Sequence, residues 1–80
     1  DLGCTYLTMG SLWNEINNYQ NGLTYSEKAL EILEKALPPN HPGLATLFNN
    51  IGFSHQGLGH CSNAITFYQK TLHIQLMSLP

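Results

Sequence analysis

Residues 24–32 read TYSEKALEI, and residues 66–74, 42 positions later, read TFYQKTLHI. The same offset pairs residues 1–38 with residues 43–80 without a gap, and it gives nine identical pairs. The identities fall at positions 2, 10, 21, 24, 28, 30, 32, 37 and 38 and at their partners. The chain is therefore predicted to consist of two copies of one unit, residues 1–38 and 43–80, joined by a linker at 39–42.

Each unit contains two stretches with apolar residues at helical spacing, separated by a short break. The break is Gly57-Leu58-Gly59 in the second unit and Asn17-Asn18 in the first. Since Asn and Gly both tolerate the left-handed conformation that ends helices, Asn17 is expected to act as Gly59 does one unit later. Short breaks make consecutive helices antiparallel, so the predicted fold is all-α, an α-solenoid of two helix-turn-helix hairpins. The four helices are expected at about 2–16, 20–37, 43–57 and 61–78.

The linker is Pro39-Asn40-His41-Pro42, and its histidine raises the question of a ligand site. A metal or catalytic role needs partners of the right type, whereas the neighbours of His41 are proline, asparagine and glycine. Asn40 or His41 is instead expected to cap the next helix, with Pro42 in its first turn, where a missing N–H costs nothing. The linker is thus interpreted as the boundary between the units.

Composition narrows the class of partner. The net charge is −2, with three lysines and no arginine, so nucleic acid is not expected as a partner. No apolar run is long enough to insert into a membrane. The two cysteines form no C-x-x-C pair, and the chain has no glycosylation sequon, which favours a cytoplasmic setting. The chain begins with Asp1 and shows no leader-like segment, so we expect no signal peptide and a longer parent protein.

The unit resembles the tetratricopeptide repeat, in which aromatic, glycine and small residues recur at fixed offsets. Glycine and alanine at positions such as 52 and 64 let two helices approach closely, and large residues fill the surrounding space. This resemblance implies two hairpins of antiparallel helices stacked in a right-handed superhelix. The matching residues are Phe48, Ile51, Gly52, His55, Gly59, Ala64, Tyr68 and Thr71 in the second unit, and Tyr6, Met9, Gly10, Trp13, Asn17, Tyr19, Gly22, Ser26 and Ala29 in the first.

Some residues depart from that pattern. His55 stands where an aromatic residue is expected, and Gly22 replaces alanine inside a helix, which costs about 0.5–1 kcal/mol. Cys61 is expected to pack as a small apolar residue. The period of 42 and the stretch ALEILEKALPPNHPGLATLFNNIG at residues 29–52 resemble the kinesin light chain subtype, in which the second helix is extended.

No arrangement of reactive side chains indicates catalysis. His55, His60 and Cys61 with the distant Cys4 lack the two close-spaced ligand pairs of a structural zinc site. The GLGHCS stretch at 57–62 is not preceded by a strand, so it is interpreted as a turn rather than a phosphate-binding loop. We predict no catalytic, cofactor or metal site and no enzyme activity.

Polar residues on the first helix of each unit are the candidate binding surface. Asn49, Phe53 and Gln56 are spaced to lie on one helical face, and first helices line the concave side of a stacked array. The family resemblance implies that Asn50 hydrogen-bonds the backbone of an extended peptide and that Phe53 adds an apolar contact. The alternative is that these residues only solvate an exposed face. The candidate residues are Thr8, Ser11, Asn14, Asn49, Asn50, Phe53 and Gln56.

The leading functional prediction is a protein–protein interaction scaffold that presents this surface to a peptide or partner protein. One alternative is an architectural or self-associating segment, because neither end carries a polar capping helix and solenoids usually need about three or more repeats. Another is a regulatory arm of a larger protein whose effector domain lies elsewhere. Further repeats in the parent chain or self-association are expected.

Overall fold

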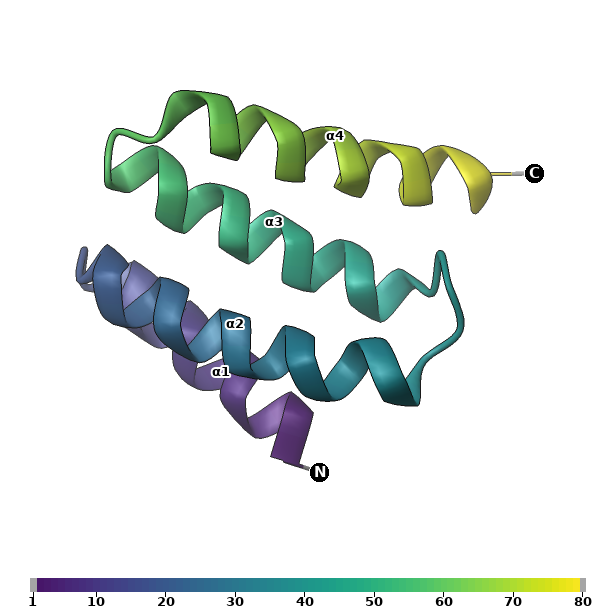
Figure 1. Ribbon diagram of the computed structural model, residues 1–80, viewed down its shortest axis with the longest axis horizontal. Helices are drawn as coiled ribbons and strands as arrows, with labels where there is room; N and C mark the ends of the chain where they lie inside the picture. The colour runs from purple at the N-terminus through teal and green to yellow at the C-terminus, as the bar shows by residue number, and fades with distance from the viewer. Residues whose placement is uncertain (1, 80) are drawn as a thin grey trace.

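The computed structural model describes residues 2–79, and these form four helices joined by short connections (Figure 1). They are α1 (Leu2–Glu15), α2 (Tyr19–Ala36), α3 (Pro42–Gly57) and α4 (Cys61–Met77). The all-helical prediction of two hairpins in series is confirmed, and each observed helix end lies within one residue of its expected position. Residues 1 and 80, the outer bounds of the predicted units, lie outside the described residues.

The two hairpin turns have the same backbone conformation, in which a left-handed residue ends the first helix. Asn17 and Gly59 both have positive φ, at 65° and 83°. In the second turn the His60 N–H donates to the His55 carbonyl at 2.8 Å, and in the first the Asn18 N–H donates to the Trp13 carbonyl at 2.9 Å. These bonds satisfy helix-end carbonyls in the manner of a Schellman motif. The predicted equivalence of Asn17 and Gly59 is confirmed.

The linker ends one helix and begins the next. Leu37 leaves α2 with an extended backbone, and Pro42 occupies the first turn of α3. Nδ1 of His41 accepts a hydrogen bond from the Gly43 N–H at 2.9 Å, so His41 is the N-cap of α3. Of the two residues expected to cap this helix, Asn40 and His41, the structure shows His41 as the cap.

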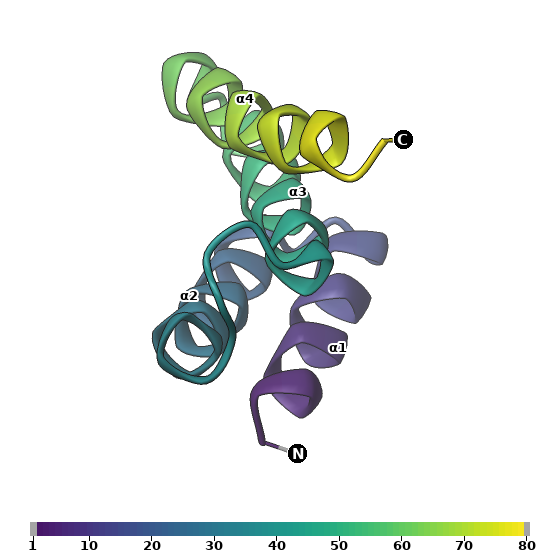
Figure 2. The same cartoon turned by 90° about the vertical axis from the view of Figure 1, so that its right-hand side faces the viewer.

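One hydrophobic core runs through both hairpins. Figure 2 shows α3 lying over the gap between α1 and α2, with α4 on its far side. The side chains of Leu47 and Ile51 on α3 are almost fully buried, and Gly52 brings the Tyr68 ring against the α3 backbone. Buried apolar residues come from α2, α3 and α4, namely Leu23, Ala29, Leu33, Leu44, Ala45, Leu47, Ile51 and Ile74.

The outward faces of the first and last helices remain apolar. On α1, Leu12 is 55% exposed, and Ile16, which directly follows this helix, is 67% exposed. On α4, Ile65, Leu72 and Leu76 are also more than half exposed. These faces have no neighbouring helix within residues 2–79. Cys61 is exposed at the start of α4, so the prediction that it packs as a small apolar residue is wrong.

Candidate functional site

Three candidate residues, Ser11, Asn14 and Asn50, belong to a polar junction between α1 and α3. The Asn14 side chain is only 5% exposed. Its amide nitrogen donates to the Asn50 carbonyl at 3.3 Å, and the Ser54 hydroxyl donates to its Oδ1 at 2.8 Å. The expectation that Asn14 faces a partner is therefore wrong, because this side chain is buried and bonded within the chain. We call Asn14, Ser54, Asn50 and Ser11 the polar junction.

Gly22 on α2 makes room for the polar junction. A methyl group at this position would overlap the Asn14 side-chain carbonyl and lie about 3.2 Å from the Ser54 hydroxyl oxygen. Glycine inside a helix lowers stability relative to alanine. Here its small size is what allows Asn14 to reach across to α3. The departure of Gly22 from the repeat pattern is thus explained by packing.

Asn50 also ties α3 to α1 through its side chain. Its amide nitrogen donates to the Ser11 hydroxyl oxygen at 2.7 Å, and both residues are half-buried. The Asn50 amide that was expected to hold a peptide backbone therefore has an intramolecular partner. No donor among the described residues is bonded to its Oδ1.

The exposed part of the candidate surface centres on Phe53. This side chain is 44% exposed, and its ring lies 5.8 Å from that of Tyr19, between ring centroids. Gly57 permits this arrangement, because a Cβ there would overlap the Tyr19 ring. Tyr19, Phe53, Gln56 and Gly57 together line a shallow depression.

Gln56 is exposed at the rim of this depression and is oriented by Tyr68. The Tyr68 hydroxyl donates to the Gln56 Oε1 at 2.8 Å. Burial raises the pKa of Tyr68, so this hydroxyl keeps its proton and remains a donor. Its hydrogen bond leaves the Gln56 amide nitrogen directed elsewhere. Sequence reasoning assigned Tyr19 and Tyr68 to packing and missed their part in this surface.

The other candidates are more scattered. Thr8 is exposed, and its hydroxyl donates to the Cys4 carbonyl within α1 at 2.9 Å. Asn49 is exposed on α3, one turn before Phe53. The structure thus groups Phe53 and Gln56 with Tyr19 and pairs Ser11 with Asn50, and no described contact connects Thr8 to either group. We refer to Tyr19, Asn49, Phe53 and Gln56 as the α3 surface.

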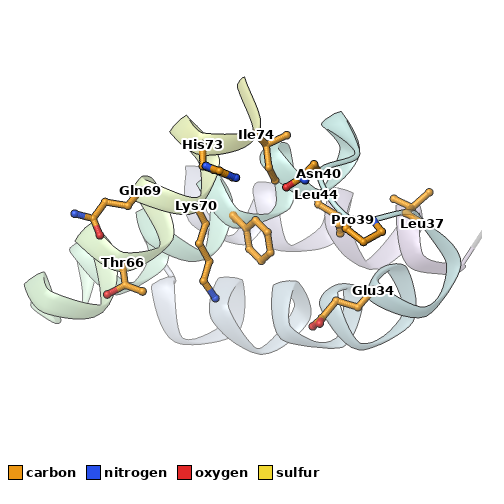
Figure 3. Close-up of a pocket in the computed structure, with 11 residues that line it drawn as sticks. Glu34, Leu37, Pro39, Asn40, Leu44, Thr66, Gln69, Lys70, His73 and Ile74 are labelled. Atoms are coloured by element: carbon orange, nitrogen blue, oxygen red, sulfur yellow. The ribbon is translucent and has the colours of Figure 1, made fainter. Parts of the chain in front are cut away.

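A second hollow, of about 590 Å³, lies between α2 and α4 (Figure 3). Leu44, Phe48 and Ile74 supply its apolar lining. The Lys70 ammonium lies 5.4 Å from the Phe48 ring centroid, and Glu34 lies on α2 across the hollow. This hollow forms where the two units meet across the linker, so the spacing within either unit did not predict it.

Two histidines meet at the turn between α3 and α4. The Nδ1 atoms of His55 and His60 lie 3.1 Å apart, and the His55 ring stacks on Phe67 at 5.7 Å and 15°. Burial lowers the pKa of His55, His60 lowers it further, and Glu27 acts in the opposite direction. Within the part of the chain that the structure describes, no three His, Cys, Asp or Glu side chains cluster to hold a metal ion.

Comparison with known proteins identifies the repeat. A family model described as "Tetratricopeptide repeat" matches residues 1–76. No curated protein and no solved structure matches the chain. Among residues 2–79, none of the helices combines the length and apolarity needed to cross a bilayer.

Proposed function

The chain belongs to the tetratricopeptide repeat family, whose repeats serve as protein–protein interaction scaffolds, and from this we propose that its α3 surface binds an extended peptide or a partner protein. The observation that carries the proposal is Phe53, an aromatic side chain left 44% exposed on a well-packed helix. Aromatic residues are enriched among the side chains that dominate binding energy. Tyr19 braces the Phe53 ring, so little rotamer freedom is lost on binding.

The surrounding polar groups support recognition of a peptide backbone. Gln56 and Asn49 are exposed amides on the same face as Phe53, and each offers a donor and an acceptor. Asn50 keeps its Oδ1 for a partner while its nitrogen holds Ser11. Ser11 and Thr8 extend the proposed surface onto α1. No lysine or arginine lies among these residues, so the proposed ligand is recognised by hydrogen bonds and apolar contact rather than by charge.

Peptides selected from a random phage-displayed library against the 80-residue chain provide the probe. Their affinities for the parent chain, for Phe53→Ala and for Leu72→Ala are measured by fluorescence polarisation. We expect Phe53→Ala to weaken binding about tenfold or more, the loss typical of a central aromatic contact. Leu72→Ala is the matched control, because Leu72 is a similarly exposed apolar residue on α4. Equal affinity of Phe53→Ala and the parent would refute the proposed surface.

End-to-end association is a second candidate function, favoured by the exposed apolar faces of α1 and α4. Met9 and Ile16 correspond by the 42-residue offset to Ile51 and Leu58, which pack within the molecule. The apolar surface at the C-terminal end of α1 is thus suited to packing, yet Leu12 and Ile16 are more than half exposed in residues 2–79. Sedimentation velocity at several concentrations tests this function. A concentration-dependent rise in mass that Ile16→Glu abolishes supports it, and a monomer at every concentration contradicts it.

Two finer assignments are proposals as well. The kinesin light chain subtype is supported by the 42-residue period and by the His41-capped linker, and repeats of the same period in the parent sequence would test it. A cytoplasmic setting is supported by the exposed Cys61 thiol, which a reducing compartment keeps reduced. Imaging of the tagged parent protein tests this location. A role as the regulatory arm of a larger protein depends on sequence outside these 80 residues.

A further inference from the structure

The turn between α3 and α4 holds two imidazole rings in a fixed relationship. His60 directly precedes α4, and its N–H bonds the His55 carbonyl at 2.8 Å, which locks the backbone between them. The His55 ring is nearly parallel to the Phe67 ring, at an interplanar angle of 15°, and is buried. The His60 side chain makes no capping bond to α4 and meets His55 instead.

The two Nδ1 atoms lie at the distance of an N–H···N hydrogen bond between the rings, and the same separation suits a metal ion that takes the place of the shared proton. Zinc binds imidazole nitrogen at about 2.0–2.1 Å. An ion at that distance from two nitrogens 3.1 Å apart has an N–metal–N angle of about 95–102°. This angle lies between the 90° of square-planar or octahedral geometry and the roughly 109° of a tetrahedral site.

We propose that His55 and His60 bind a divalent transition metal ion of the zinc, nickel or copper class through their Nδ1 atoms. Imidazole suits these ions, whereas magnesium and calcium prefer oxygen ligands. No third His, Cys, Asp or Glu joins the pair in residues 2–79, so water completes the coordination shell. His60 is exposed, which gives the ion access from solvent. The bound ion would join the last turn of α3 to the N-cap residue of α4.

The first unit supplies an internal comparison. Its equivalent positions hold Trp13 and Asn18, which offer no such nitrogen pair. The backbone at Asn18 (φ −93°, ψ 75°) nearly matches that at His60 (φ −89°, ψ 70°). His60→Asn is therefore a substitution that the same turn already accepts one unit earlier.

The test titrates ZnCl₂ or NiCl₂ into the 80-residue chain by isothermal titration calorimetry. We expect one ion per chain and an affinity at least tenfold lower for His60→Asn. The control His73→Asn removes an exposed histidine elsewhere on α4 and should leave binding unchanged. Cys61→Ser should also bind normally, because the proposed ligands are both imidazoles.

Two further readouts locate the ion. Long-range ¹H–¹⁵N spectra should show Zn²⁺ shifting the Nδ1 resonances of His55 and His60 but not those of His41. Zn²⁺ should raise the melting temperature of the parent chain and not that of His60→Asn. The proposal is overturned by no binding at millimolar metal, by unchanged binding in His60→Asn, or by loss of binding in Cys61→Ser.

Discussion

Replacing Gly22 with alanine should destabilise this protein, although the same change usually stabilises a helix. Alanine gains about 1 kcal/mol over glycine in a helix interior. Here the added methyl group overlaps the Asn14 Oδ1 and forces that side chain to give up its bonds with Ser54 and Asn50. The two lost hydrogen bonds cost about 2 kcal/mol together, and overpacking that remains after Asn14 has moved aside adds up to about 1 kcal/mol. We expect Gly22→Ala to lower the free energy of unfolding by about 1–2 kcal/mol.

The cause can be isolated in the Asn14→Ala background. Asn14→Ala alone should cost about 2 kcal/mol, and it leaves Ser54 bonded to the Asn50 carbonyl at 3.1 Å. With the amide gone, Gly22→Ala should recover its ordinary gain of about 1 kcal/mol. The coupling between the two positions is then about 2–3 kcal/mol, well above the roughly 0.5 kcal/mol expected of independent sites.

Urea denaturation followed by far-ultraviolet circular dichroism measures all four variants. The slope of unfolding free energy against urea should stay constant, so that midpoints report stability. Gln20→Ala, at an exposed position on the same helix, serves as the control and should have the same effect in both backgrounds. The explanation is wrong if Gly22→Ala stabilises the parent chain, or if the two substitutions are additive.

Three further predictions concern other parts of the fold. Ser26 is fully buried, and its hydroxyl has no hydrogen-bond partner among residues 2–79. Ser26→Ala should therefore raise the free energy of unfolding by about 1 kcal/mol, and a urea midpoint no higher than that of the parent would contradict this. A methyl group at Gly52 would lie 2.9–3.2 Å from atoms of the Tyr68 ring. Gly52→Ala should therefore lower the free energy of unfolding by about 1–3 kcal/mol, measured by thermal unfolding. An unchanged melting temperature would contradict this, because it would show that the ring moves aside freely. Burial and His60 lower the pKa of His55 in the folded chain, and Glu27 acts in the opposite direction. The His55 imidazole therefore binds a proton more readily in the unfolded chain than in the folded one. The free energy of unfolding should fall as the pH drops through about 6.5 toward the lower pKa of the folded state. Urea midpoints at pH 7.5 and 5.5 with a chelator present measure this effect, and His55→Phe should reduce the difference.

The sequence predicted the features that depend on local chemistry. The left-handed residues Asn17 and Gly59 and the His41 cap each follow from residues adjacent in the chain. The repeat follows from matching residues 42 positions apart, with no need of a contact between them. The orientation of Asn14 could not be predicted from its neighbours in the chain. A polar residue on α1 points either to solvent or to the second unit, and the angle at which α1 and α3 cross decides between the two. The pairing of Tyr19 with Phe53 depends on the same long-range packing.

On α4, helical spacing of apolar residues did not predict which side chains are buried. Leu72 and Leu76 follow the helical pattern expected of a core, yet both are exposed on α4. The spacing predicts an apolar helix face that is suited to burial. Burial itself requires a neighbouring helix or partner on that face, which residues 2–79 do not include. The sequence therefore identified the face but not its occupant.

The helices contribute unequally to the shared core, and this predicts the order in which they unfold. α3 contributes Leu47 and Ile51 to the interior, whereas the buried residues of α1 are Gly3, Gly10 and Asn14, with no large apolar side chain among them. Amide hydrogens in the middle of α3 should therefore exchange with solvent only when the whole chain unfolds. Those of α1 should exchange through local opening, which requires less free energy than global unfolding. Detachment of α1 would break the polar junction while α2, α3 and α4 stay together. The first helix is thus the natural starting point for partial unfolding, and the third is the last to be released.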